Sequence, residues 1–275
     1  MSAVGGVLRG RVRWWLLLAA VLIVFLGPML VLMLSAAAAR WSFPDLLPAA
    51  LSARGLELLL RSGGPIALAL VSSTGYALLV VLLAFLVSVL PASVLARYEF
   101  RGRLLLEALF LSPVLIPAIT YGMGIHFTFI RVGLANTLPG VVLVLTAAAY
   151  PYMLRALIAG FQQIHPDYDA CAANLGAPVL VRLVRVHIPL LGPAILSGAS
   201  VVFLVAFSEY FLVFLIGGGA VPSYTGYLFP FLSGGDRTLG ATLTLLFVLV
   251  PLLLFVTLDR GLERFYHRRG MGMAL

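Results

Sequence analysis

The sequence predicts an all-α protein that crosses a membrane several times, and three observations support this fold class. Of the 275 residues, 62% are hydrophobic and only 10% are charged, whereas soluble domains carry about 25% charged residues. The apolar residues gather in long stretches separated by short segments that carry arginine. Each stretch reaches the ~20 residues that a helix needs to cross ~30 Å of hydrocarbon, where unpaired backbone groups are too costly for other structures.

Six apolar stretches divide the chain, which we treat as one transmembrane domain, 1–275. The N-terminal arginines before the first stretch are also typical of a signal peptide, but residues 14–34 exceed its usual apolar length of about 7–15 residues, so we expect a retained helix. A short surface helix is expected near Leu56–Leu60, and prolines 113, 117 and 151 are expected to kink their helices. The predicted spans are 14–39, 65–90, 104–127, 138–158, 191–217 and 238–258.

The distribution of arginine predicts the orientation of these spans. An even number of spans places both termini, the segment after the second span and the segment after the fourth span on one side, and these four segments hold 13 of the 18 basic residues. The other side holds five, namely Arg40, Arg54, Arg61, Arg131 and Arg237. Because short cytoplasmic segments are enriched in basic residues, we predict that both termini are cytoplasmic.

Residue types that are rare or missing exclude several functions. Every basic residue is arginine, so the lysine of a phosphate-binding loop is missing and any ATP hydrolysis must come from another chain. The single cysteine, Cys171, excludes an intrachain disulfide, and the four histidines have no metal-ligand spacing, so no metal site is expected. The arginines flank apolar runs rather than lining one soluble face, which favours membrane lipid over nucleic acid as their partner.

One cytoplasmic segment, 161–189, is moderately polar in an otherwise apolar chain. Pro166 is suited to the first turn of a helix, and Asp167 and Asp169 would lie in that positively polarised turn. The helix is expected over 167–175 and should end at Gly176, a residue that adopts the left-handed conformation without strain.

A second short helix is expected after this glycine. Pro178 would begin it, and Pro189 would stop it before the fifth span. The segment therefore predicts a helix, a glycine corner and a second helix on the cytoplasmic face, a shape suited to docking into a partner's groove.

The same segment resembles the "EAA" loop of the permease subunits of ABC importers. That pattern is E-A-A, three residues, G, nine residues and I-x-L-P, and this chain has A-C-A-A-N-L-G at 170–176 followed by V-H-I-P at 186–189. The spacing matches at Ala172, Gly176 and Pro189, with Val186 and Ile188 as conservative replacements. The family's glutamate is replaced by Ala170, and Asp169, one position earlier, is a candidate for the same carboxylate.

A second loop supports this resemblance. Residues 92–97, A-S-V-L-A-R, and 100–103, F-R-G-R, are similar to the A-x-x-x-A-R-x-x-F-x-G-R loop that follows the second span in these permeases. The similarity covers roughly residues 65–260. It implies the six-helix fold of type I importer permeases and a multi-pass location in the bacterial inner membrane.

The resemblance also implies the function and the partners. A permease of this kind pairs with a second permease, identical or different, docks on ABC ATPase subunits that bind ATP and Mg²⁺, and receives its substrate from an extracytoplasmic binding protein. No cofactor is expected on this chain, and it is not expected to be an enzyme. Arg182 and Arg185 either pair with acidic groups of the ATPase or lie near lipid headgroups. The predicted coupling residues are Asp169, Ala170, Cys171, Ala172, Ala173, Asn174, Leu175, Gly176, Ala177 and Pro189.

Polar residues in the spans mark a candidate translocation pathway. Glu209 lies midway through the fifth predicted span, and intramembrane carboxylates usually face a bundle interior or an aqueous cavity. A purely structural hydrogen bond is the alternative role. Glu107, near the cytoplasmic end of the third span, is expected to pair with Arg101 or Arg103. The pathway candidates are Tyr121, His126, Ser208, Glu209 and Tyr210.

The substrate and two competing functions stay open at this stage. The glycines at 217–219 and the segment 233–237 look most similar to permeases for polyamines, thiamine, iron or phosphonate, and two intramembrane carboxylates suit a small polar or cationic solute. A secondary transporter would need repeated halves with broken helices at an ion site, and no such repeat is visible. A membrane-embedded enzyme would need clustered catalytic side chains.

Overall fold

The described part of the protein is built from helices. The computed structural model describes residues 2–39, 41 and 45–268. Within these ranges every secondary-structure element is a helix, apart from one isolated β-bridge between Ala38 and Leu51. This confirms the predicted fold class. Arg40 and Arg269, which enter the charge count, lie outside the described residues.

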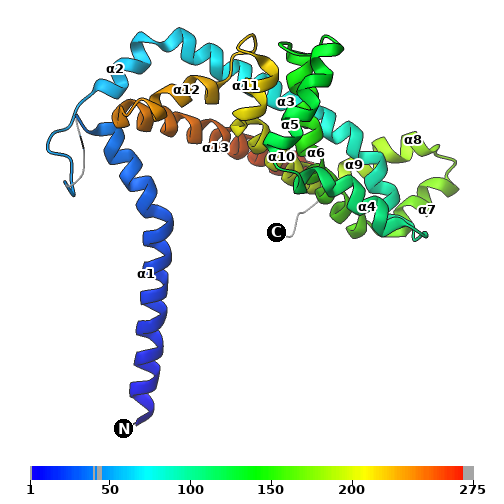
Figure 1. The fold of residues 1–275 in the computed structure, drawn as a ribbon. Helices are drawn as coiled ribbons and strands as arrows, with labels where there is room; N and C mark the ends of the chain where they lie inside the picture. The colour runs from blue at the N-terminus through cyan, green and yellow to red at the C-terminus, as the bar shows by residue number, and fades with distance from the viewer. Residues whose placement is uncertain (1, 40, 42–44, 269–275) are drawn as a thin grey trace. The chain divides into compact units, whose positions relative to one another are not determined.

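The helices follow one another with short connections (Figure 1). The first half of the chain contains α1 (Ser2–Ala37), α2 (Arg54–Arg61), α3 (Gly63–Arg97), α4 (Arg103–Leu111), the 3₁₀ helix η1 (Ser112–Leu115), α5 (Ala118–Arg131) and α6 (Leu138–Gln163). The second half contains α7 (Pro166–Asn174), α8 (Val179–Arg182), the π-helix η2 (Leu183–His187), α9 (Ile188–Leu190), α10 (Gly192–Ser208), α11 (Phe211–Gly217), α12 (Tyr224–Ser233) and α13 (Arg237–Arg268).

Several of these helices are long and apolar enough to cross a membrane. Four qualify alone: Leu17–Ala37, Gly63–Arg97, Leu138–Gln163 and Arg237–Gly261. Two bent pairs qualify together, so the described residues hold up to six spans by length and composition. These pairs are Arg103–Leu115 with Ala118–Arg131, and Val179–Leu190 with Gly192–Ser208.

The third predicted span is sharply bent at Pro117. The backbone leaves the helical conformation at Ile116, where ψ is 126°, and at Pro117, where ψ is 132°. The helices on either side meet at 95°. A proline disfavours the helical conformation of the residue before it and removes a backbone donor, so the helix breaks here. The expected kink is present as a full break.

The fifth predicted stretch is also interrupted. Helix α10 ends at Ser208 and α11 begins at Phe211, so Glu209 lies in a helix break rather than inside a continuous helix. Neither this break nor helix α12 was predicted from the sequence, because the apolar pattern runs on through both.

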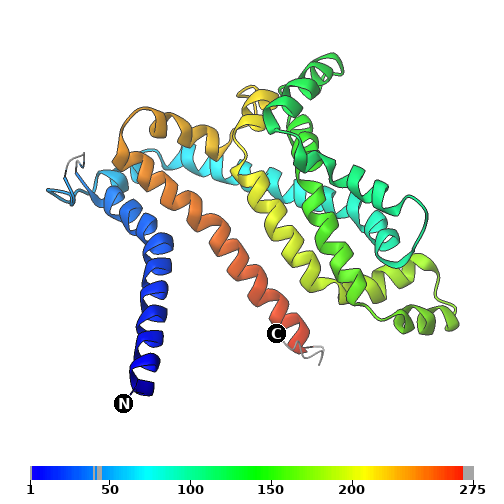
Figure 2. The same cartoon turned by 60° about the horizontal axis from the view of Figure 1, so that its bottom comes forward.

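The structure divides into two units, Met1–Gly63 with Leu228–Leu249, and Gly64–Tyr227 with Val250–Leu275. In the second unit α6 and α10 pack side by side (Figure 2). Small residues allow this approach, since a Cβ atom at Gly198 would press against Met153 and one at Gly160 would press against Ala194. Helices in membranes commonly associate through such small residues.

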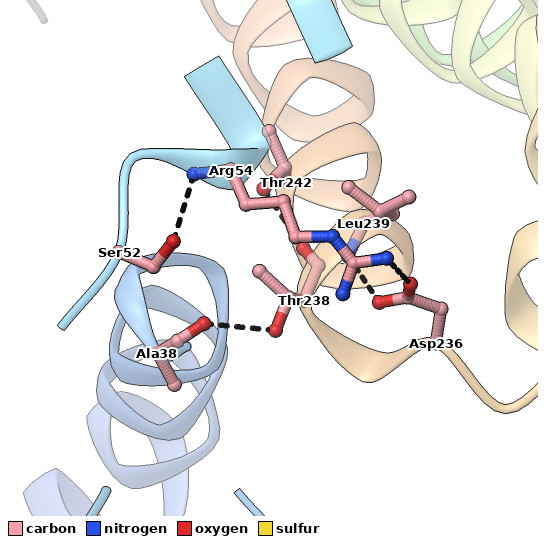
Figure 3. Close-up of polar contacts among 7 residues, drawn as sticks. All are labelled: Ala38, Ser52, Arg54, Asp236, Thr238, Leu239 and Thr242. Carbon is pink, nitrogen blue, oxygen red and sulfur yellow. Dashed lines mark hydrogen bonds and ion pairs between the residues drawn. The ribbon is translucent and has the colours of Figure 1, made fainter. Parts of the chain in front are cut away.

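In the first unit, polar contacts join the residue after α1 and the first residue of α2 to the start of α13 (Figure 3). Arg54 at the start of α2 forms an ion pair of 2.7 Å with Asp236. The buried Thr238 hydroxyl donates to the Ala38 carbonyl at 2.9 Å. Helix α2, expected near Leu56–Leu60, is confirmed and lies so close to α13 that a side chain at its Gly55 would clash with Thr242.

Candidate coupling site

The first half of segment 161–189 folds as the sequence predicts. Helix α7 begins at Pro166, and Asp167 and Asp169 lie in its first turn. Gly176 has a φ of +78°, its N–H donates to the Ala173 carbonyl at 2.9 Å, and the Ala177 N–H donates to the Ala172 carbonyl at 3.0 Å. This pair of bonds is the Schellman arrangement, which requires a left-handed residue after the helix. The glycine corner is therefore set by the backbone itself.

The second half differs from expectation at Pro189. Helix α8 begins directly after Pro178, as predicted, but the helical path continues through η2 and α9 to Leu190 and bends by 76° only before α10. Pro189 therefore does not stop the helix. Because α9 begins at Ile188, Pro189 falls in a first turn, where a missing N–H costs little.

Asp169 is the centre of an ion cluster. Its Oδ2 atom lies 3.1 Å from Arg182 Nη1 and 3.8 Å from Arg97 Nη1, and its Oδ1 atom lies 3.3 Å from His187 Nε2. Only the Arg182 contact is a hydrogen bond by geometry. Arg182, which was expected either to pair with the ATPase or to lie near headgroups, is thus engaged within its own chain.

Aromatic packing ties this cluster to α6. The Arg97 guanidinium carbon lies 5.2 Å from the centre of the Phe161 ring, a cation–π distance. The His187 ring meets the same phenylalanine edge-on at 5.9 Å. Phe161 is fully buried near the end of α6, and Arg97 is the last residue of α3. The cluster therefore connects α3 and α6 with both halves of the loop, α7 before Gly176 and α8 with η2 after it.

His187 is held in a setting that favours its neutral form. Burial lowers the pKa of its imidazole below the ordinary value of 6.5, and the positive charge of Arg97 lowers it further. Asp169 opposes these effects and Arg182 adds to them. The net pKa is lowered, so the ring is neutral near pH 7 and the excess charge of the cluster comes from its two arginines.

A cleft lies beside the cluster. It has a volume of about 480 Å³ and is lined by α7 on one side and by the ends of α3 and α6 on the other. Polar groups at its wall include Asp169, Arg97, Arg182 and Gln162, and α7 adds the small side chains of Ala170 and Ala173.

Several large apolar side chains of the loop are exposed. Leu175 at the glycine corner is 87% exposed, and further exposed apolar residues follow on α8 and η2. Large exposed apolar groups that cluster on one segment indicate a site of interaction. We call this set the loop's apolar patch, and it consists of Tyr168, Leu175, Val179, Leu180 and Val184.

The pathway candidates lie on helices that touch one another. Tyr121 and His126 are on α5, which packs against α11 so closely that a side chain at Gly122 would meet Leu212. Glu209, in the break before α11, accepts a hydrogen bond of 3.1 Å from the Leu212 N–H. The carboxylate therefore caps the first turn of α11, where negative charge is favourable.

The rest of the break is also hydrogen-bonded. The Thr225 hydroxyl donates to the Glu209 carbonyl at 3.2 Å, and the Ser208 hydroxyl donates to Val205 in its own helix. Tyr210 stacks on Phe214 one turn further along. These contacts support the structural role of Glu209 that the sequence left open, and they leave its role in a pathway untested.

The predicted partner of Glu107 is wrong. Its carboxylate pairs with Arg155 of α6 at 3.2 Å, while Arg103 pairs with Glu99 at 3.2 Å. The turn at Gly102, with a φ of +92°, lets Arg103 reach back to Glu99, and α4 carries Glu107 toward α6 instead.

Sequence reasoning also missed three members of the cluster: Arg97, Phe161 and His187. Arg97 falls in the second resembling loop, so it was visible as a motif residue. Its contact with the other loop spans 72 positions, and only the packing of α3 against the loop brings them together.

These features define a class of protein. The chain has several membrane-length helices and a polar helix–glycine–helix loop with an exposed apolar patch, as expected for a membrane transport component that docks on a partner. The model of the family described as "Binding-protein-dependent transport system inner membrane component" matches residues 86–268, and the chain belongs to this family.

Curated relatives agree with this assignment. The trehalose/maltose transport system permease protein MalG of Thermococcus litoralis is 34% identical over 138 residues, which are 50% of this chain and 49% of MalG. A probable sulfate transport system permease protein of Nephroselmis olivacea is 30% identical over 52% of this chain and 54% of its own. The molybdenum transport system permease protein ModB of Mycobacterium bovis is 33% identical over 46% and 53%. The chain thus spans about half the length of the curated relatives it matches.

The fold has a close counterpart among solved structures. A chain of a bacterial ABC transporter involved in the import of the acidic polysaccharide alginate superposes with a TM-score of 0.74, covering 94% of this chain and 98% of that chain at 15% identity. A second structure of an alginate ABC transporter, in complex with a periplasmic protein that carries an alginate pentasaccharide, gives a TM-score of 0.69. At this identity the likeness concerns the fold.

Proposed function

We propose that the chain is a permease subunit of an ABC importer and that segment 161–189 couples it to a separate ATPase. The observation that carries this proposal is the geometry of the loop: a short helix closed by a left-handed glycine and followed by a second short helix, with the exposed residues of the apolar patch distributed over both halves. Membership of the binding-protein-dependent family supports it.

The proposed mechanism uses the loop as a mechanical contact. ATP-driven closure of two ATPase subunits moves the docked loops of two permeases, and the spans alternate between inward-facing and outward-facing states. A loaded extracytoplasmic binding protein biases the same equilibrium from the other side. This chain contributes packing and a path for the solute, and bond cleavage takes place on the ATPase.

The topology and the pathway complete the proposal. We place both termini and segment 161–189 in the cytoplasm, with six spans that together form one domain. The path would run near the helix break at Glu209, with Ser208 and Tyr210 beside it and with Tyr121 and His126 on the adjacent α5. The broken helix supports this location, since unwound backbone in membrane helices commonly lines a cavity.

We propose a small polar or cationic solute as substrate, delivered by a binding protein. The named relatives belong to transport systems for trehalose and maltose, sulfate and molybdenum, and this range does not single out the polyamine, thiamine, iron or phosphonate branch that the sequence favoured. The branch therefore stays a prediction.

Co-expression with a candidate ATPase tests the function. We expect the wild-type chain to co-purify with the ATPase and to support ATP hydrolysis that rises when the binding protein is added. A charged replacement in the apolar patch, Leu180→Glu, should remove the ATPase, whereas Leu47→Glu, at a similarly exposed leucine outside the loop and outside the predicted spans, should keep it. Transport that persists without an associated ATPase would support a secondary transporter instead.

A further inference from the structure

The ion cluster shows which groups of its own chain Asp169 contacts. Both carboxylate oxygens already face basic side chains of the same chain: the charged Arg182 at 3.1 Å and Arg97 at 3.8 Å, and the imidazole of His187 at 3.3 Å. The carboxylate is about one-third exposed and the three partners are 20%, 23% and 7% exposed. A carboxylate with this many internal partners is poorly placed to serve as the main ionic contact of another protein.

The partners of Asp169 come from different parts of the chain. Arg97 ends α3, Arg182 ends α8, and His187 ends the π-helix η2. Phe161, fully buried near the end of α6, packs against both Arg97 and His187. The cluster thus joins both halves of the loop to the ends of the two long helices α3 and α6.

We propose that Asp169 and its partners form a lock that holds the loop rigidly on α3 and α6, so that a push on the loop moves these helices. This inference rests on the proposed function. Asp169 is here a positioning residue that orients α7, and the apolar patch makes the contact with the ATPase. Because breaking one member of a partly buried ionic network leaves the others uncompensated, the lock should respond strongly to single substitutions.

Two features around the cluster support this role. Arg182 Nε and His187 Nε2 are buried without a hydrogen bond among the described groups, so these side chains depend on Asp169 for compensation. In addition, the chain after α8 passes through the π-helix η2, which ends at His187, and such local widening of a helix often occurs at functional positions.

The single cysteine makes the lock testable on the chain alone. Cys171 is exposed on α7, two residues from Asp169, and a nitroxide attached to it reports the mobility of the loop. In the full-length chain in lipid nanodiscs, Asp169→Asn should shift the balance from the ordered toward the mobile spectral component by about tenfold, the worth of one hydrogen bond to a charged group. Asp167→Asn removes the same charge from the same helix, at a side chain that is 80% exposed, and should leave the spectrum unchanged.

A double-mutant cycle checks the pair directly. Asp169→Asn and Arg182→Gln should each raise the mobility, and the double variant should be little worse than either alone, because both remove one shared interaction. Equal mobility of wild type and Asp169→Asn would overturn the lock, and so would strictly additive effects.

The assembled transporter then tests the purpose of the lock. Asp169→Asn should still co-purify with the ATPase but lose about tenfold of the stimulation of ATP hydrolysis by the binding protein. Full stimulation with a mobile loop would refute the coupling role of the lock, and loss of co-purification with an ordered loop would make Asp169 a direct contact. If the wild type binds no ATPase, the proposed function fails, while the spectra still decide on the lock.

Discussion

Substitution of Gly176 tests the role of the glycine corner, because a side chain there would meet no neighbouring atom while the backbone is in the left-handed conformation. Gly176 has a φ of +78°, and a Cβ atom built on it meets nothing within 4 Å. The substitution Gly176→Ala therefore adds no clash, and its cost comes from the left-handed backbone. That cost is about 1–2 kcal/mol for a residue with a Cβ atom.

The backbone cost of Gly176→Ala can be converted into an expected loss of affinity for the ATPase. If the ATPase docks only on the closed corner, 1–2 kcal/mol weakens its affinity by about 5- to 30-fold. Gly176→Asn should lose less than Gly176→Ala, because asparagine tolerates the left-handed region better. Titration of the purified ATPase onto the chain in nanodiscs measures both dissociation constants.

The matched control is Gly102→Ala, in the turn between α3 and α4. Gly102 has a φ of +92° and also has nothing within 4 Å of a built Cβ atom, so the backbone cost is similar but lies outside the coupling loop. We expect its affinity for the ATPase to stay near the wild-type value. Equal affinities for Gly176→Ala and the wild type would refute the reasoning, and so would an asparagine variant that binds more weakly than the alanine variant.

Three further predictions follow from contacts outside the corner. Gly55→Val should lower the free energy of unfolding by about 1–3 kcal/mol, since its side chain would press into Thr242, and thermal unfolding in nanodiscs would measure this. The lowered pKa of His187 implies that its contribution to loop order is present above about pH 6.5 and is lost as the pH falls through the folded-state pKa, so the Cys171 nitroxide should become more mobile in acid and His187→Gln should abolish this dependence. Glu107→Gln should cost at most about 1 kcal/mol in unfolding, because its partner arginine is 66% exposed, and a loss above 3 kcal/mol would contradict this account of the pair.

Local chemistry made the helices and the glycine corner predictable. The apolar stretches are long enough to cross a membrane, where backbone groups must be paired and only helices meet this requirement. Pro166 and Gly176 determine where a helix begins and ends through their own backbone conformation, which is a local effect. The break at Pro117 is likewise a property of proline and its neighbour.

Partners across the chain were not predictable in the same way. Glu107 was expected to pair with a nearby arginine and instead pairs with Arg155, 48 positions away, because the turn at Gly102 redirects α4. Pro189 was expected to end a helix, yet a new first turn accommodates it. In each case the outcome depends on how whole helices are arranged, and a sequence pattern does not contain that information.

The ion cluster around Asp169 was not predictable for the same reason, because its members come from different helices. The sequence placed Asp169 in the loop and left its role open, and the loop's own pattern contains no signal for Arg97 or Phe161. The helix break at Glu209 was not predicted, because a carboxylate inside an apolar run indicates an intramembrane charge. In the structure the carboxylate accepts a hydrogen bond from the Leu212 N–H and caps helix α11.

Site-specific cross-linking tests the central claim most directly. Cys171 is the single cysteine of the chain and is exposed on α7, so a short thiol-to-amine cross-linker attached there should capture whatever docks on the loop. In membranes that contain the assembled transporter, we predict a cross-link to the ATPase subunit and a loss of ATP hydrolysis on cross-linking. If Cys171 is labelled fully but yields no ATPase adduct in a transporter that is active, segment 161–189 is not the coupling loop.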